Sequence, residues 1–249
     1  LETRGADPPF VAMMDDYLDA MAIDEVREVL DLGCGTGIVA RAIAKRADFS
    51  GRVIGVDLST YLVEAASRLS TEEGLADSVR FEAGDTQSLG FESDSFDAIV
   101  AHTLMSHVPD PDAVLGEAAR LVRPGGAIGV FDGDFASLSF EPENAEDAAQ
   151  NDARLVGSVS SQPRVMRRLP RLARDAGLSI ERSFAYVLTE VGQAEFWESS
   201  VHSLGALLPK AGAMTQEEAD AWVASQMRAS EEGVFFGTSN YYGYVLRRP

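Results

Sequence analysis

Hydrophobic positions along the first half of the chain follow two alternating patterns. Short apolar runs of strand length occur at 29–32, 52–57, 78–83, 96–101 and 127–132. Between them are segments with apolar residues at helical spacing, at 10–23, 37–47, 61–74 and 111–122. Buried strands that alternate with amphipathic helices predict an α/β fold, in which a mostly parallel sheet carries helices on both faces.

The pattern changes after Phe135. Residues 141–152 carry five acidic side chains and predict a surface helix or loop. Helices are predicted at 163–176, 193–208 and 215–232, and strands at 178–190 and 234–247. We expect these two strands to pair antiparallel at the sheet edge, with a helical insertion between them that covers the functional site.

The chain of 249 residues fits one α/β domain over residues 1–249. Within it we expect a nucleotide-binding core at 25–135. The segments 136–177 and 191–232 are then predicted to be helical parts that cover a substrate.

The charge excludes several partners. A net charge of −19, from 40 acidic and 21 basic residues, disfavours nucleic acids and anionic membranes as partners. The basic stretch from Arg164 to Arg174 alternates with apolar residues, as one face of an amphipathic helix does. The single cysteine precludes an intramolecular disulfide. No apolar run approaches the ~18 residues that span a membrane, and no signal-peptide pattern is visible, so a cytoplasmic location is expected.

A glycine-rich turn follows the first buried strand, in the sequence from Val29 to Gly37. Glycines at 33, 35 and 37 permit a tight turn and a close approach of backbone to ligand. Gly35-Thr-Gly-Ile-Val-Ala40 also fits the fingerprint of dinucleotide-binding proteins. The motif therefore predicts a nucleoside site without choosing the nucleoside.

Three acidic residues bear on which nucleoside this site would bind. Asp57 ends the second strand, where a carboxylate can bind a ribose diol, although it could instead cap the next helix, a role also open to Ser59. Asp31 lies inside an apolar strand and needs a partner, which the ammonium group of S-adenosylmethionine (SAM) would supply. Asp85, between Gly84 and Thr86, could bind an adenine amino group or simply form a turn.

Six ordered motifs then resemble those of class I SAM-dependent methyltransferases. They are Asp-Leu-Gly-Cys-Gly-Thr-Gly (31–37), Val-Asp-Leu-Ser (56–59), Gly-Asp-Thr (84–86), Phe-Asp-Ala-Ile-Val (96–100), His-Val-Pro-Asp-Pro (107–111) and Leu-Val-Arg-Pro-Gly-Gly (121–126). The chain is most similar in style to the ubiquinone- and menaquinone-biosynthesis-like group, which methylates small molecules. The resemblance implies a Rossmann-like, seven-stranded sheet with a reversed last strand.

The resemblance also implies roles for individual residues in binding SAM. The methionine and ribose would be lined by Gly33, Cys34 (through its backbone), Gly35 and Gly37. Asp57 and Leu58 would contact the ribose and adenine, and Gly84, Asp85 and Thr86 the adenine edge. His102 would lie near the methionyl arm, and Arg4 would close over the carboxylate.

The acceptor side is predicted beyond the carboxyl ends of the fourth and fifth strands. His107 is the candidate general base, with Asp134 as a weaker catalytic candidate. Asp132-Gly-Asp134 could hold Mg²⁺, but no third ligand is evident, so we favour a turn and expect no metal. The predicted substrate contacts suit a partly apolar or aromatic acceptor: His107, Asp132, Trp197, His202 and Phe235.

Two other functions remain open from the sequence. An NAD(P)-dependent oxidoreductase would share the glycine-rich turn and Asp57, but would not need Asp31. A SAM-binding protein without catalysis would share all the binding motifs. A nucleic-acid methyltransferase is disfavoured by charge and by the tetrapeptide at 102–105, which lacks the Pro-Pro pattern of that class. The expected partner is a small-molecule acceptor, and a homodimer is one alternative for the oligomeric state.

Overall fold

The computed structural model describes residues 2–249, apart from the side chains of Thr3, Arg4 and Ala145. The chain divides into two compact units. Unit 1 extends to Asp132 and also includes Met166–Phe184 and Tyr242–Pro249. Unit 2 comprises Gly133–Val165 and Ala185–Tyr241. Three long strands have residues in both units: β5 (Val122–Phe140), β6 (Ser179–Gly192) and β7 (Phe235–Arg247).

The described residues form a seven-stranded sheet of order β3-β2-β1-β4-β5-β7-β6. Its first four strands in the chain are β1 (Glu28–Leu32), β2 (Arg52–Asp57), β3 (Val79–Ala83) and β4 (Phe96–His102). Parallel pairs join β1 to β2 and β4, β2 to β3, and β4 to β5. In the register, Leu30 lies opposite Ile54 on one side and Ile99 on the other, so the centre of the sheet is apolar. The predicted parallel core is confirmed.

The last strand is antiparallel to its neighbours. Within unit 1, the Gly125 amide donates to the Arg248 carbonyl (2.8 Å), and within unit 2 the Glu141 amide donates to the Phe236 carbonyl (3.1 Å). Residue numbers rise along β5 while the numbers of their partners on β7 fall, so these two strands run antiparallel. Between β6 and β7, the Ser179 hydroxyl donates to the Arg247 carbonyl (3.3 Å) and the Thr189 and Thr238 hydroxyls lie 2.7 Å apart, so these strands are antiparallel as well. The predicted reversed last strand is confirmed, and β7 lies between β5 and β6.

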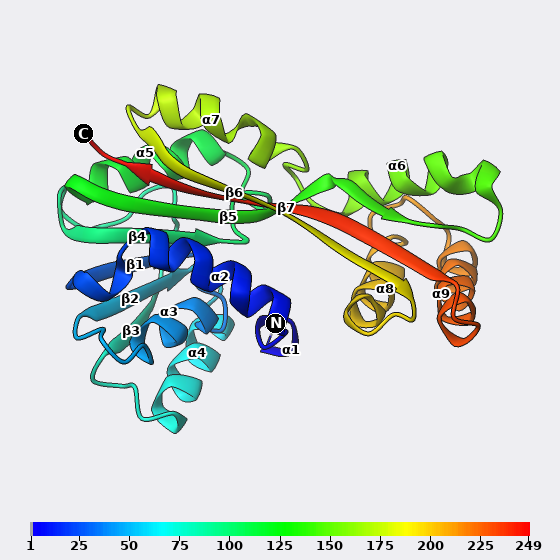
Figure 1. Ribbon diagram of the computed structural model, residues 1–249, viewed down its shortest axis with the longest axis horizontal. Coiled ribbons are helices and arrows are strands. Elements are labelled where there is room, and N and C mark those ends of the chain that lie inside the picture. Colours follow the sequence, from blue (N-terminus) through cyan, green and yellow to red (C-terminus); the bar gives the residue numbers. More distant parts are fainter. Residues whose placement is uncertain (1) are drawn as a thin grey trace. The chain divides into compact units, whose positions relative to one another are not determined.

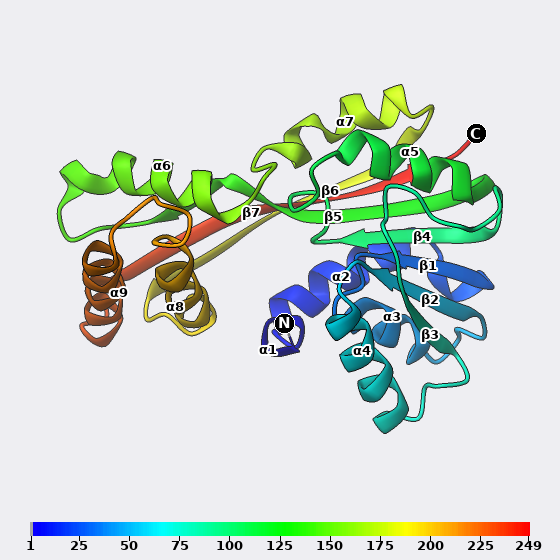
Figure 2. The ribbon, with the colours of Figure 1, turned by 180° about the vertical axis from the view of Figure 1, so that it is seen from behind.

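Helices cover both faces of the sheet in unit 1 (Figure 1). The helices concerned are α2 (Pro8–Ala20), α3 (Ile38–Ala44), α4 (Thr60–Glu72), α5 (Pro111–Leu121) and α7 (Val165–Asp175). The crossovers through α3 and α5 run outward from the middle of the sheet in opposite directions. Because such crossovers are right-handed, α3 and α5 lie on opposite faces, as the two views in Figures 1 and 2 show.

Helix starts follow the cap residues of the sequence. The Ser59 hydroxyl accepts a hydrogen bond from the Leu62 amide at the start of α4, and the Asp110 carboxylate accepts one from the Ala113 amide before α5. Pro111 occupies the first turn of α5, where a missing N–H costs nothing. Local chemistry therefore sets where these helices begin.

Helix α2 packs closely against β5 because Gly129 has no side chain. A Cβ atom at this position would lie 2.4 Å from the Met21 sulfur and 3.0 Å from the Tyr17 ring. The buried face of α2 includes Phe10, Met14 and Tyr17. These residues form the apolar layer beneath the site described below.

Unit 2 has an aromatic core around Phe140, the last residue of β5. Trp197 and Trp222 meet the Phe140 ring edge-to-face, with ring centroids 5.5 and 5.6 Å away. Its helices are η2 (Ala145–Asp147), α6 (Ala148–Val159), α8 (Phe196–Leu207) and α9 (Gln216–Glu231). The helices expected near 193–208 and 215–232 are thus confirmed, and the acidic stretch 141–152 contains η2 and the start of α6.

Strand β5 is longer than its sequence pattern indicated. The expected strand ended at 132, because Asp132-Gly-Asp134 has the composition of a turn. In the structure the strand continues to Phe140, and both aspartates are fully buried. Among the described residues, no helix is long and apolar enough to cross a membrane.

Candidate functional site

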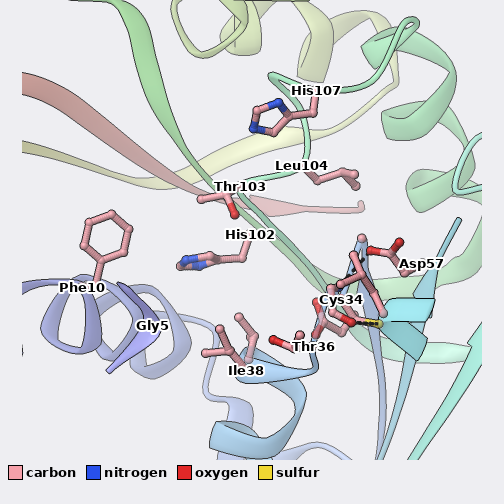
Figure 3. A pocket seen from close by; sticks show the side chains of 15 residues that line it. Gly5, Phe10, Cys34, Thr36, Ile38, Asp57, His102, Thr103, Leu104 and His107 are labelled. Carbon is pink, nitrogen blue, oxygen red and sulfur yellow. Dashed lines mark hydrogen bonds between the residues drawn. The ribbon is translucent and has the colours of Figure 1, made fainter. Parts of the chain in front are cut away.

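A cavity of about 270 Å³ lies in unit 1, at the carboxyl ends of β1, β2 and β4. Figure 3 shows residues from each of these strand ends: Cys34 and Thr36 after β1, Asp57 at the end of β2, and His102 at the end of β4. The strand order reverses between β1 and β4. Open α/β sheets bind their ligands at such a switch point.

The glycine-rich turn forms the floor of this cavity. Gly33 has a φ of +66°, which favours glycine, and a Cβ atom there would lie 2.5 Å from a methyl group of Leu104. The Cys34 amide donates to the Val56 carbonyl (3.0 Å), so the turn is tied to β2. Burial is the main cause that raises the pKa of the Cys34 thiol, helped by Asp31 and Asp57, so the thiol stays protonated and unreactive.

Asp31 lies beneath the turn and lines the cavity, with 2% of its surface exposed. Among the described residues, the only hydrogen bond to its carboxyl group comes from the Ala40 amide (3.2 Å). Burial, together with the charge of Asp57, raises the pKa of Asp31 to about 8. This environment therefore disfavours the ionised form of Asp31, and a cationic ligand group in the cavity would stabilise it.

Asp57 connects the glycine-rich turn to the start of α4. One carboxylate oxygen accepts from the Gly35 amide and the other from the Ser59 amide, each at 2.9 Å. The geometry of Asp57 is therefore compatible with both roles considered from the sequence, which are binding a ribose diol and capping the next helix. Asp57 stabilises the turn, and its carboxylate still has lone pairs that a ligand's hydroxyl groups can use.

The loop after β4 supplies the other wall, with Thr103, Leu104 and His107 lining the cavity. Asp132 anchors this loop from β5: its carboxylate accepts hydrogen bonds from the amide (2.9 Å) and hydroxyl (3.0 Å) of Ser106. Asp132 is fully buried and does not line the cavity. The structure thus places His107 at the site and Asp132 behind it.

Several predicted SAM contacts lie outside the cavity lining. These residues are Gly37, Leu58, Gly84, Asp85 and Thr86. Leu58 is 76% exposed, so its side chain is open to contact with a flat ring such as adenine. The Asp85 carboxylate accepts hydrogen bonds from the backbone amide (3.0 Å) and side chain (3.1 Å) of Gln87, which lower the pKa of Asp85. Asp85 therefore has the geometry of a turn residue, and its adenine contact stays a prediction.

The N-terminal helix α1 (Glu2–Gly5) borders the cavity through Gly5. The Glu2 carboxylate accepts from the Thr36 hydroxyl (2.6 Å) and pairs with the buried Arg41 (2.8 Å). These bonds tie α1 to the glycine-rich turn. The side chain of Arg4 lies outside the described residues, so its predicted contact with a carboxylate stays a prediction.

The remaining predicted residues lie in unit 2. Trp197 and Phe235 are buried against Phe140 in the aromatic core of that unit, which is a packing role. His202 is exposed on α8, and Asp134 is fully buried in β5. Within the described part of the chain, no three His, Cys, Asp or Glu residues are grouped so as to hold a metal ion.

Some residues that line the cavity were not singled out from the sequence: Gly5, Phe10, Thr36, Ile38, Val39 and Leu62. Phe10 belongs to the apolar face of α2, and its helical periodicity in the sequence predicted only that it is buried in the core. Thr36 lies within the glycine-rich motif, so its position inside that motif was the available signal.

Comparison with known proteins gives relatives for part of the chain. Residues 29–126 match the protein family described as "Methyltransferase domain". The chain is 38% identical over 123 residues to sterol 24-C-methyltransferase of Aspergillus fumigatus, covering 49% of this chain and 32% of the relative. It is 38% identical over 113 residues to ubiquinone biosynthesis O-methyltransferase of Paracidovorax citrulli, covering 45% and 46%. The chain thus spans half or less of the length of these curated relatives.

The fold is shared with geranyl diphosphate C-methyltransferase from Streptomyces coelicolor. The two are 18% identical with a TM-score of 0.59, covering 96% of this chain and 79% of the other. That crystal structure contains Mg²⁺, geranyl diphosphate and S-adenosyl-L-homocysteine. Residues 29–126 therefore resemble a methyltransferase domain, and the strand order with a cavity at its switch point is the Rossmann-like arrangement that the sequence predicted for a class I methyltransferase.

Proposed function

We propose that this chain is a SAM-dependent methyltransferase that acts on a small, partly apolar or aromatic molecule. One observation carries the proposal. Asp31 and Asp57 come from adjacent parallel strands and line the same cavity, so an ammonium group and a ribose diol can be bound together. An NAD(P) site would use Asp57 alone.

When bound, SAM supplies a methyl group on a cationic sulfonium. Asp31 would be its partner for the ammonium group, and the Asp57 carboxylate would accept hydrogen bonds from the ribose hydroxyls. Leu58 would cover the adenine ring, with Gly84, Asp85 and Thr86 at its edge. Arg4, on the helix that borders the cavity, would pair with the methionyl carboxylate.

The acceptor would approach from the wall formed by the loop after β4. His107 is exposed there and lines the cavity, so it can take a proton from an acceptor that must lose one. Phe10, Ile38 and Leu104 give the cavity an apolar side, which supports an apolar or aromatic acceptor. The helical segments 136–177 and 191–232 stay a prediction for the part that covers the acceptor, and so do the substrate contacts of Trp197, His202 and Phe235.

The proposal is tested by thermal unfolding with SAM, S-adenosylhomocysteine, NAD and NADP. At a concentration of about 100 times Kd, SAM should stabilise the native state by about 2.7 kcal/mol and raise Tm by about 5–10 °C. We expect S-adenosylhomocysteine to act similarly and the nicotinamide cofactors to have no effect. Stabilisation by NAD or NADP alone would refute the methyltransferase proposal and favour an NAD(P)-dependent oxidoreductase.

A second prediction concerns the ribose. Asp57→Ala should weaken SAM binding by about 1–3 kcal/mol, or about 5- to 150-fold in Kd, because hydrogen bonds to a charged acceptor are lost. Isothermal titration calorimetry measures the change, and Asp77→Ala, at an exposed acid of the same unit, is the control. An unchanged affinity in Asp57→Ala would refute the ribose assignment.

A further inference from the structure

Tyr17 of α2 and His102 at the end of β4 are 85 residues apart in sequence and form a hydrogen-bonded pair. The Tyr17 hydroxyl lies 3.1 Å from Nδ1 of His102. Tyr17 is 1% exposed and does not line the cavity, whereas His102 does. The pair therefore links the apolar layer under α2 to the ligand site.

The direction of this hydrogen bond follows from burial. Burial, with the charges of Asp31 and Asp15, raises the pKa of Tyr17 well above its usual range, so the hydroxyl keeps its proton. Among the described residues, His102 is the only hydrogen-bond partner of that hydroxyl. A buried O–H rarely lacks an acceptor, which favours Tyr17 as the donor and Nδ1 of His102 as the acceptor. The proton of a neutral His102 ring is then on Nε2.

Aromatic packing holds the ring in this orientation. Phe131 stacks on His102 with ring centroids 4.7 Å apart and on Tyr17 with centroids 6.1 Å apart. Gly129, two residues before Phe131 on β5, leaves the space that Tyr17 occupies. Neither ring can turn freely, so the hydrogen bond selects between two tautomers of a ring that is already placed.

We propose that Tyr17 is a positioning residue that fixes His102 as a neutral imidazole with its proton on Nε2, and so makes His102 an N–H donor at the cavity. The ligand part rests on the proposed function: the acceptor of this N–H is the carboxylate of the methionyl group of SAM. A neutral ring also avoids repulsion of the cationic sulfonium and ammonium groups of SAM. Tyr17 acts through His102 and does not touch the ligand.

The tautomer can be read directly from a long-range ¹H–¹⁵N correlation spectrum of the uniformly ¹⁵N-labelled protein. The chain has three histidines, so the spectrum is simple, and the His102 signals are those missing in His102→Gln. We expect the Nε2–H tautomer in the wild-type protein without any ligand. In Tyr17→Phe the same signals should shift toward the other tautomer. An Nδ1–H tautomer in the wild type, or an unchanged pattern in Tyr17→Phe, would overturn the proposal.

Calorimetry with SAM tests the ligand part through a double-mutant cycle. Tyr17→Phe should raise the Kd for SAM by about 3- to 10-fold in the wild-type background, as expected for one hydrogen bond. In the His102→Ala background the same change should have no further effect, because the partner is gone. Additive effects would refute action through His102. Tyr242→Phe, a half-buried tyrosine of β7 in the same unit, is the control.

The NMR spectrum and the calorimetry can refute the two parts of the proposal independently. The wild-type tautomer does not depend on SAM, so a protein that binds no SAM would refute the proposed function and leave the Tyr17–His102 assignment standing. A wild-type protein that binds SAM but carries the proton on Nδ1 would refute only the role of Tyr17.

Discussion

Asp31→Asn is expected to make the ligand-free protein more stable at pH 8 while it weakens SAM binding. The pKa of Asp31 is about 8 in the folded protein, against an ordinary value of 3.8. Between these values the folded state binds more protons than the unfolded state. Stability therefore falls as pH rises from about 4 to about 8 and then levels off.

Asparagine removes this titration and can still accept the hydrogen bond from the Ala40 amide. The gain over wild type should be close to zero at pH 4 and grow to about 2–5 kcal/mol at pH 8, since each pKa unit corresponds to about 1.4 kcal/mol. Urea unfolding at several pH values measures it. Asp48→Asn, at an exposed acid, should show no such trend. A gain that does not depend on pH would contradict the assignment of the raised pKa.

The same substitution should raise the Kd for SAM by about 10- to 100-fold, because a hydrogen bond between charged groups is lost. Calorimetry above pH 8, where the wild-type carboxyl group is ionised, gives the comparison. A stabilised variant with wild-type affinity would mean that Asp31 is not the partner of the ammonium group. Asp31 would then need another explanation for its costly burial.

Gly37→Ala is expected to destabilise the protein by about 2–5 kcal/mol. Gly37 has a φ of +80°, where an L-residue pays about 1–2 kcal/mol. Its Cβ atom would also lie 2.4 Å from the Phe81 ring and 3.2 Å from the Ala66 side chain, and overpacking of this kind costs about 1–3 kcal/mol more. Urea unfolding of the ligand-free protein measures the sum.

Gly74→Ala provides the matched control. Gly74 has a φ of +74°, but among the described residues nothing lies within 4 Å of the added Cβ atom. We therefore expect it to lose only about 1–2 kcal/mol, from the backbone conformation alone. Equal losses in the two variants would show that the contact with Phe81 is relieved and that Gly37 is required only for its φ angle.

The sequence determined most of the fold and the floor of the site. Strands such as 29–32 and helices such as 111–122 were readable because burial, periodicity and capping act over a few residues. The glycine-rich turn, Asp31 and Asp57 were readable for the same reason. Each owes its role to the residues directly beside it on a strand end.

The tertiary structure alone decided which distant side chains meet. Asp132 had the composition of a turn, yet it is buried in a long strand and anchors the loop that carries His107. Tyr17 had only a core role until the fold brought its hydroxyl to His102. Such pairs depend on how α2 and the strands pack, which local patterns do not specify. Periodicity shows that a residue is buried, whereas packing decides which partner it finds there.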